Sequence, residues 1–320
     1  MRVLFWGTPA FAVPTLRALG EEGHEVVGVV TQPDRPAGRG RSLQASPVKE
    51  VALEEGIPVL TPERPRGESF EAEIRALKPE VSVVVAYGHI LRPEILEIPP
   101  RGSWNVHASL LPELRGAAPI HWAIARGHPV TGISVMRMTE GMDEGPVIHR
   151  VEVEIQPTET STELGTRLAE VGAQALIEGL ALLEFGLGDP EEQDHGRATY
   201  APKVSREVAR IDWTRPARAV VDHIRAMDTV PGAWTDWNGE PLKFFRPSPD
   251  LPEDAPAVDP ARDGAPGTVV AAVPGPDGVL GVQAGDGVVW LREVQPAGKR
   301  RMDVGSWLQG RGAEIGTRFT

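Results

Sequence analysis

The sequence predicts an α/β fold with a doubly wound, Rossmann-like and mostly parallel sheet, followed by a small OB-fold-like β-barrel domain. Strand and helix patterns alternate from the first residues to residue 184. Residues 81–86 form a nearly continuous β-branched run, which is typical of a strand buried on both faces. After residue 230 the pattern changes to short strands separated by Asp, Gly and Pro turns.

In the first part of the chain, short apolar segments predict strands, and segments with helical periodicity lie between them. We expect strands at 2–6, 25–31, 57–60, 81–86, 103–107, 132–138 and 146–155. We expect helices at 11–19, from Pro47 onward, at 68–77 and at 162–184. The stretch from Gln32 to Ser46 contains two prolines and two glycines, and we interpret it as a long irregular loop.

The second part follows a polar stretch at 186–199 that has few apolar anchors. We expect helices at 216–227 and 304–308, and strands at 233–237, 242–245, 267–273, 279–283 and 288–294. Residues 247–266 are a Pro/Asp/Ala-rich insertion. These changes of composition predict a first domain at 1–188, a linker at 189–207 and a second domain at 208–320.

The composition excludes several classes of protein. The chain has 320 residues, enough for two domains, and no cysteine, which excludes a disulfide framework, a thiol nucleophile and a cysteine-bound metal. No apolar run reaches the length of a membrane span, and the first strand is too short for a signal peptide, so we expect a cytoplasmic protein without membrane contact. The net charge of −12 argues weakly against a general nucleic-acid coat, although residues 31–49 carry four basic side chains against one acidic side chain.

The most informative local pattern is an amide and an imidazole two residues apart, Asn105 and His107. On a strand this spacing places both side chains on one face. The pair falls at the carboxyl end of an expected strand, where α/β proteins bind their ligands, and a turn with Pro112 and Gly116 follows. An amide and an imidazolium can both donate hydrogen bonds to an oxygen that gains charge in a transition state.

A third polar residue, Asp143, lies in a loop between two expected strands. Each of the three residues alone has an ordinary interpretation. Asn105 could cap a turn, His107 could be a core histidine with satisfied hydrogen bonds, and an aspartate near glycines is usually a turn residue. The joint spacing of Asn105 and His107 before the Pro112 turn favours a catalytic site.

Several motifs, spread over nearly the whole length, resemble those of the 10-formyltetrahydrofolate-dependent formyltransferases. In the first domain they are Gly7-Thr8-Pro9, the segment Thr31 to Gly40, Val84 to Gly88, Asn105-Val106-His107, Ser109 to Pro112, Arg115 to Ile120 and Gly141-Met142-Asp143. In the second domain they are Ala209 to Trp213, Ile224-Arg225-Ala226 and Gln295 to Lys299. The arginine-rich loop makes the resemblance closest to the members that act on methionyl-tRNA.

The resemblance implies a mechanism and a set of site residues. Asn105, His107 and Asp143 would be catalytic, with Asn105 and His107 stabilising the oxyanion and Asp143 orienting His107 and helping to move protons. The formyl donor would be 10-formyltetrahydrofolate, used as a cosubstrate without a metal. Its binding site would be formed by Ser109, Leu110, Leu111 and Pro112, together with Tyr87 and Ile90.

The acceptor implied by the resemblance is initiator methionyl-tRNA, bound by a monomer. The residues expected to contact the tRNA are Arg35, Arg39 and Arg41 in the loop and Lys299, Arg300 and Arg301 in the second domain. Arginine suits phosphates and base edges because its planar fork donates several hydrogen bonds. Without the resemblance, a solvated charge run explains the basic residues of the loop about equally well.

Four alternatives differ in what they require. A sugar-nucleotide formyltransferase would share the catalytic trio, but the arginine loop and the second basic cluster disfavour it. A glycinamide ribonucleotide formyltransferase would be shorter and lack the second domain. A dinucleotide-binding dehydrogenase is disfavoured because the first strand ends in Gly7-Thr8-Pro9 and not in a Gly-x-Gly-x-x-Gly turn. A non-catalytic RNA-binding module would give the trio no reason to converge.

Overall fold

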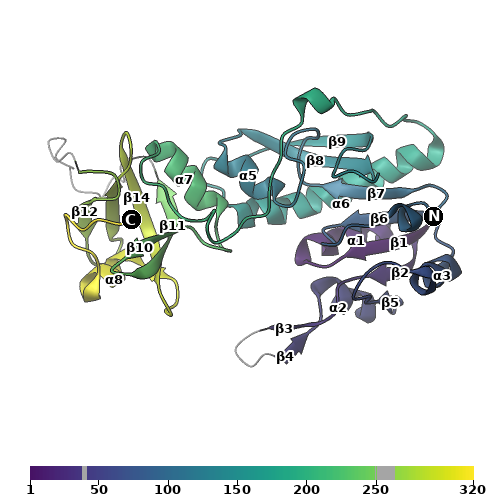
Figure 1. Cartoon of the computed structure of the whole chain (residues 1–320), viewed down its shortest axis with the longest axis horizontal. Helices are drawn as coiled ribbons and strands as arrows, with labels where there is room; N and C mark the ends of the chain where they lie inside the picture. Colours follow the sequence, from purple (N-terminus) through teal and green to yellow (C-terminus); the bar gives the residue numbers. More distant parts are fainter. Residues whose placement is uncertain (38–41, 249, 251–263) are drawn as a thin grey trace. The chain divides into compact units, whose positions relative to one another are not determined.

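The computed structural model describes residues 1–37, 42–248, 250 and 264–320, which form two compact units (Figure 1). Both units are discontinuous in the sequence. Unit 1 consists of Met1–Pro119, Val130–Glu154 and Gly165–Ala201. Unit 2 consists of Ile120–Pro129, Ile155–Leu164 and Pro202–Thr320.

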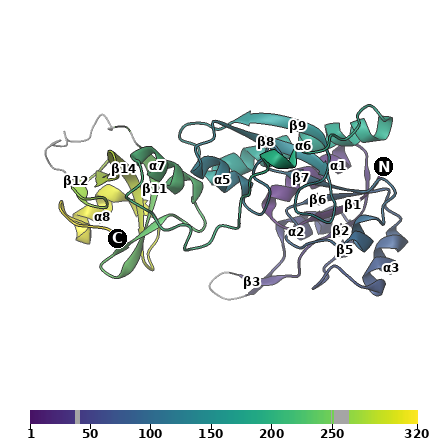
Figure 2. The ribbon, with the colours of Figure 1, turned by 45° about the horizontal axis from the view of Figure 1, so that its top comes forward.

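Unit 1 is built on a seven-stranded sheet with the order β5-β2-β1-β6-β7-β8-β9. The strands are β1 (Arg2–Gly7), β2 (Glu25–Val30), β5 (Val59–Leu60), β6 (Val81–Val85), β7 (Ser103–His107), β8 (Val130–Arg137) and β9 (Val147–Glu154). Pairing is parallel from β5 to β7 and antiparallel for β8 and β9. Figure 2 shows the sheet running from β5 at one edge to β9 at the other. The predicted mostly parallel α/β sheet is confirmed.

The longer helices of this part of the chain follow the expected periodic segments. They are η1 (Ala10–Ala12), α1 (Val13–Glu21), α2 (Pro47–Glu54), α3 (Glu68–Leu77), α4 (Pro93–Leu96), α5 (Pro119–Ala125), α6 (Ser161–Phe185) and η2 (His195–Arg197). All five residues of β6 are buried, as its β-branched run predicts for a central strand. The short helices α4 and α5 have too few turns to show a sequence period and were not expected.

The segment from Gln32 to Ser46 is more regular than we expected. Strands β3 (Arg35–Ala37) and β4 (Ser42–Gln44) pair as an antiparallel hairpin. The hydroxyls of Thr31 and Ser46 lie 2.7 Å apart at its base, and Lys49 Nζ contacts Asp34 at 2.8 Å. Strands of three residues are too short for alternation to be recognised in a sequence, so the prolines and glycines of the segment indicated a loop instead.

Unit 2 contains an antiparallel sheet with the order β10-β11-β14-β13-β12, with β15 paired to β14. Its elements are α7 (Ala217–Ala226), β10 (Trp234–Trp237), β11 (Glu240–Ser248), β12 (Val269–Val273), β13 (Val279–Gln283), β14 (Val288–Pro296), β15 (Met302–Asp303) and α8 (Val304–Arg311). The rings of Trp213, Phe244 and Phe319 pack together within about 6 Å, forming part of its core. The succession of short strands that the sequence predicted is confirmed, and most of the expected insertion at 247–266 lies outside the described residues.

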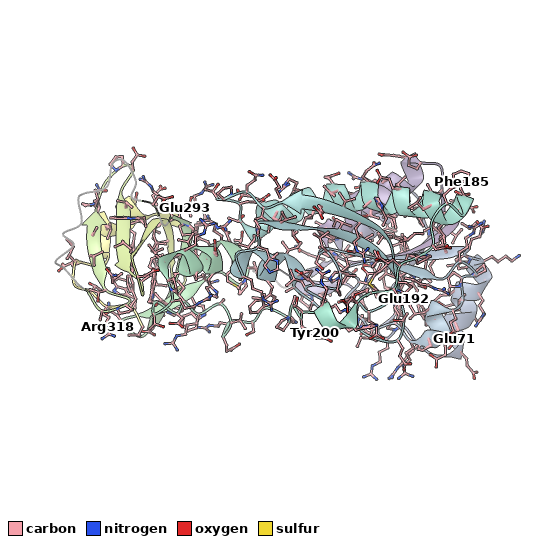
Figure 3. All side chains as sticks on the ribbon, turned by 90° about the horizontal axis from the view of Figure 1, so that it is seen from above. Glu71, Phe185, Glu192, Tyr200, Glu293 and Arg318 are labelled. Carbon is pink, nitrogen blue, oxygen red and sulfur yellow. The ribbon has the colours of Figure 1, made fainter. Side chains whose placement is uncertain are left out.

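The polar stretch before unit 2 is attached to the sheet of unit 1. Residues 191–201, which we call the returning segment, form isolated bridges from Glu191 to Val147 of β9 and from Tyr200 to Arg115. Figure 3 labels Glu192 and Tyr200 of this segment. Within it, Gln193 is buried between exposed neighbours. We expected only a linker here because the segment lacks apolar anchors, but its attachment uses hydrogen bonds.

Candidate functional site

The amide and imidazole of the sequence motif lie on β7, between the parallel strand β6 and the antiparallel strand β8. Asn105 is partly exposed, and His107, the last residue of the strand, is 6% exposed. Alternation along the strand places the two side chains on one face. His107 is thus at the carboxyl end of β7, as expected, and Asn105 lies two residues before it, in the middle of the strand.

The hydrogen bonds of His107 determine which ring nitrogen is available. Its Nε2 lies 2.9 Å from the backbone oxygen of Leu114. A carbonyl oxygen only accepts, so Nε2 carries a proton and donates to it. Nδ1 lies 3.7 Å from Oδ2 of Asp143. In the neutral ring, Nδ1 is therefore the unprotonated atom, and it faces a carboxylate.

The residue that binds the imidazole is itself held in an unusual conformation. Leu114 has φ +59°, in the left-handed region that non-glycine residues rarely adopt. Its N–H donates to Oγ1 of Thr199 at 2.9 Å, and the next N–H, of Arg115, donates to the Thr199 carbonyl. The returning segment thus fixes the carbonyl that orients His107.

Asp143 reaches the histidine from a loop that starts at the opposite end of β7. It lies on residues 138–146, which connect β8 to β9 and which we call the carboxylate loop. This loop starts beside the beginning of β7, where Met138 N–H donates to the Ser103 carbonyl. Four residues of strand, about 13 Å, separate that point from His107. The loop therefore folds back along the sheet face to bring Asp143 beside the imidazole.

Two features fix the carboxylate there. Asp143 has φ +49°, and its Oδ2 accepts a hydrogen bond from Gly116 N–H at 2.8 Å. Gly116 has φ +113°, and a Cβ at this position would lie 2.9 Å from the Ala201 carbonyl oxygen. Both constraints require glycine at 116.

The segment Ser109–Pro112 forms a tight turn with a cis bond between Leu111 and Pro112. The buried hydroxyl of Ser134 on β8 donates to the Ser109 carbonyl at 2.7 Å and accepts from Leu111 N–H at 3.0 Å. Ser109 and Leu111 are buried, whereas Leu110 and Pro112 are partly exposed. Any surface for a ligand on this turn comes mainly from Leu110 and Pro112.

The other two residues expected at the folate site lie in different surroundings. The ring of Tyr87 is 2% exposed and packs edge-on against Trp6, with centroids 5.3 Å apart. Its hydroxyl has no hydrogen-bond partner among the described residues, and burial raises the pKa of this phenol to about 12. Ile90 is 84% exposed and lines an open cavity of about 490 Å³ beside Arg64, Arg66 and Arg92.

The basic residues expected to contact tRNA differ in how they are bonded. Arg35 donates from Nη2 to Gln32 Oε1 at 2.6 Å, and Arg39 and Arg41 lie outside the described residues. Lys299 and Arg300 are exposed. Arg301 instead pairs with Asp228 and Glu293 and stacks over Phe245, with its guanidinium carbon 4.0 Å from the ring centroid.

Two absences hold for the residues that the structure describes. They contain no group of three or more His, Cys, Asp or Glu side chains that could hold a metal ion, and none of their helices is long and apolar enough to cross a membrane.

Sequence reasoning missed three residues that shape the site. Ser134, Gln193 and Thr199 supply the hydrogen bonds that hold the turn, the carboxylate loop and Leu114. Ser134 lies in a strand, and the other two lie in a polar stretch, so no local pattern distinguishes them. Contacts between distant segments identify them only in the folded protein.

Comparisons with known proteins place both parts of the chain in one family. A family model described as formyl transferase matches residues 1–180, and its C-terminal domain model matches residues 203–312. A methionyl-tRNA formyltransferase of Symbiobacterium thermophilum is 48% identical over 320 residues, covering 100% of this chain and 95% of that protein.

Two solved structures share the fold. The chain resembles HypX from Aquifex aeolicus in complex with tetrahydrofolic acid, with a TM-score of 0.65 and 20% identity, over 97% of this chain and 47% of that chain. It also resembles an N-formyltransferase from Helicobacter canadensis in complex with folinic acid and dTDP-3-aminofucose. That match has a TM-score of 0.66 and 16% identity and covers 92% of this chain and 99% of the other.

Proposed function

This chain belongs to the methionyl-tRNA formyltransferases within the formyltransferase family, and we propose that Asn105, His107 and Asp143 carry its reaction. The reaction transfers the formyl group of 10-formyltetrahydrofolate to the α-amino group of methionyl initiator tRNA, for translation initiation. The observation that carries the proposal is the position of His107 Nδ1, the ring nitrogen that Leu114 does not bind. It lies beside the Asp143 carboxylate, on the strand face that also holds Asn105.

The bonds that form and break define what these residues must do. The amine nitrogen attacks the formyl carbon, and the carbonyl π electrons move to oxygen. When this intermediate collapses, the bond from carbon to the folate N10 breaks, and a proton lost by the amine reaches the departing nitrogen. The protein must stabilise the oxyanion and move one proton, and neither step requires a metal.

Asn105 supplies an amide donor for the oxyanion, a type of contact worth about 2.7–4 kcal/mol in the transition state. His107 takes the proton at Nδ1, because Nε2 is already protonated and bound to Leu114. The resulting imidazolium faces Asp143 at 3.7 Å. At an effective dielectric of about 20, full charges at that separation attract by about 4 kcal/mol before desolvation.

The two substrates would contact different sets of residues. We assign folate contact to Ser109, Leu110, Leu111 and Pro112, with Tyr87 and Ile90 as lesser contributors. We assign tRNA contact to Arg35, Arg39, Arg41, Lys299, Arg300 and Arg301. Of the second basic cluster, Lys299 and Arg300 have the most accessible charges.

The remaining assignments follow from this function. Residues 1–188 would be the catalytic domain, 189–207 the connection and 208–320 the tRNA-binding domain. We expect a monomer in the cytoplasm, where translation is initiated.

The test is a direct assay of the acceptor. Purified protein with 10-formyltetrahydrofolate should formylate charged initiator tRNA and should not formylate an aminated nucleotide sugar. The reverse result would replace the tRNA assignment by the sugar-nucleotide alternative. His107→Ala should lose turnover while tRNA binding persists, and a parallel loss of tRNA affinity would argue against a catalytic role.

A further inference from the structure

We propose that Gln193 is a positioning residue that holds Asp143 in register with His107. The proposal rests on the catalytic role proposed above for Asp143. Gln193 is in the returning segment, outside the motifs that indicate formyl transfer, and its side-chain hydrogen bonds go to Arg115, Asp143 and Gly145. It acts on the backbone of the carboxylate loop.

The side-chain amide of Gln193 is fully used. Its Nε2 donates to the carbonyl oxygens of Asp143, at 2.9 Å, and Gly145, at 2.7 Å. Its Oε1 accepts from Arg115 twice, at 3.1 Å from Nε and 2.7 Å from Nη2. These are both donors and both acceptor sites of a primary amide. A flipped amide would set its oxygen against two carbonyls, so the partners fix its orientation.

Burial makes these bonds strong constraints. Gln193 is 5% exposed and Arg115 is 2% exposed. An unmade hydrogen bond at this depth is not replaced by water, so the amide and the two carbonyls stay paired.

The carboxylate loop needs such an anchor. It enters the site from the far end of β7, and Asp143 has a left-handed backbone conformation that ordinary residues avoid. The hydrogen bond from Gly116 N–H fixes one carboxylate oxygen, but it does not hold the loop backbone. Gln193 binds the backbone directly, at Asp143 and again two residues later.

The same amide connects the loop to the other side of the site. Arg115, which donates to Gln193, directly follows Leu114, whose carbonyl binds His107. Gln193 is therefore placed between the backbone that carries the carboxylate and the backbone that orients the imidazole.

Gln193→Glu is the sharpest perturbation, because it keeps the shape and the acceptor for Arg115 but replaces the donor by an oxygen facing two carbonyls. We expect kcat to fall about 10- to 100-fold, as for a catalytic group that is held loosely. The KM values for the folate and for methionyl-tRNA should change less than about threefold, since neither binding surface is altered. Gln193→Asn, which keeps a shorter amide, should lower kcat less. It can replace the glutamate variant in the test if that variant does not fold.

A matched control separates positioning from simple destabilisation. Ser82→Ala removes one buried hydrogen bond, from Trp6 Nε1, in the same unit. Compared at equal folded fraction, Ser82→Ala should keep wild-type kcat, whereas Gln193→Glu should not. Equal kcat in the two variants would overturn the proposal.

A double-mutant cycle with Asp143→Asn tests whether Gln193 acts through Asp143. If it does, Gln193→Glu should lower kcat by less than about twofold in the Asp143→Asn background. A full, additive loss of kcat in that background would overturn the positioning role. Full activity of Asp143→Asn alone would instead refute the catalytic assignment of Asp143, so the two failures are distinguishable.

Discussion

The hydroxyl of Ser134 should contribute more stability than its size suggests, because it makes two buried hydrogen bonds at once. Ser134 is completely buried, as is Ser109, whose carbonyl accepts from it, and Leu111, whose N–H donates to it, is 3% exposed. Ser134→Ala would leave that carbonyl and that N–H without partners in a place that water does not reach.

The magnitude follows from the number of groups left unpaired. Each lost hydrogen bond costs about 0.5–1.5 kcal/mol, and a stranded buried group raises this to about 1–3 kcal/mol. Two such groups predict a loss of about 2–4 kcal/mol in the free energy of unfolding, since the turn can relax partly. For a unit of this size the midpoint of thermal unfolding should fall by about 5–15 °C.

The assay is calorimetric or chemical unfolding of the full chain, with the transition of unit 1 resolved. Ser82→Ala, which removes only one buried hydrogen bond, should lose about 1–2 kcal/mol. If Ser109–Pro112 contacts the folate, Ser134→Ala should also raise the folate KM, and Ser82→Ala should not. A stability loss no larger than that of Ser82→Ala would refute the reasoning about two stranded groups, and an unchanged folate KM would refute the role of the turn.

Four further outcomes are expected. Asn105→Ala should lower kcat about 10²- to 10³-fold with tRNA affinity unchanged, as measured by filter binding; a small loss would remove Asn105 from the oxyanion site. Gly116→Ala should cost about 2–3 kcal/mol of stability and most activity, whereas Gly186→Ala, at φ +62° with open space around it, should keep activity; equal activities would contradict the close approach to Ala201. Tyr87→Phe should leave stability unchanged or raise it by about 1 kcal/mol, because the hydroxyl has no hydrogen-bond partner among the described residues. A clearly lower free energy of unfolding in this variant would indicate that the hydroxyl is hydrogen-bonded to a bound water. Burial lowers the pKa of His223 below 6.5, so the unfolded chain binds more protons than the folded one, and unit 2 should lose stability as pH falls below about 6.5. His223→Asn should make the free energy of unfolding depend less steeply on pH, leaving the part due to His121, whose pKa burial also lowers. An unchanged pH dependence in this variant would contradict the role of His223.

The strands and the pairing of Asn105 with His107 were predictable because their signals are local. The period-two placement of Asn105 and His107, the buried run of β6 and the turn residues between the strands of unit 2 each need only a few neighbouring residues. Packing within one element or between adjacent elements then confirms the pattern.

What the sequence did not reveal depends on contacts between distant segments. Nothing near Asp143 indicates that its loop folds back along the sheet, and nothing near Gln193 or Thr199 indicates that a polar stretch anchors the site. Hydrogen bonds of this kind add no periodic or apolar signal to a sequence. The hairpin of β3 and β4 was not predicted for a different reason: its strands have three residues each, too few to show a recognisable alternation of apolar and polar side chains.

The spacing of these anchors along the chain has a consequence for biosynthesis. The hydrogen bond between Leu114 and Thr199 spans 85 residues, that between Arg115 and Gln193 spans 78, and that between Gln193 and Asp143 spans 50. Contacts this distant form only after long loops have closed. The sheet can assemble while the chain is still being made, but the site is completed only when residues near 200 have left the ribosome. A nascent chain that stops at residue 180 has Asn105, His107 and Asp143 but lacks the segment that bonds Leu114 and the carboxylate loop.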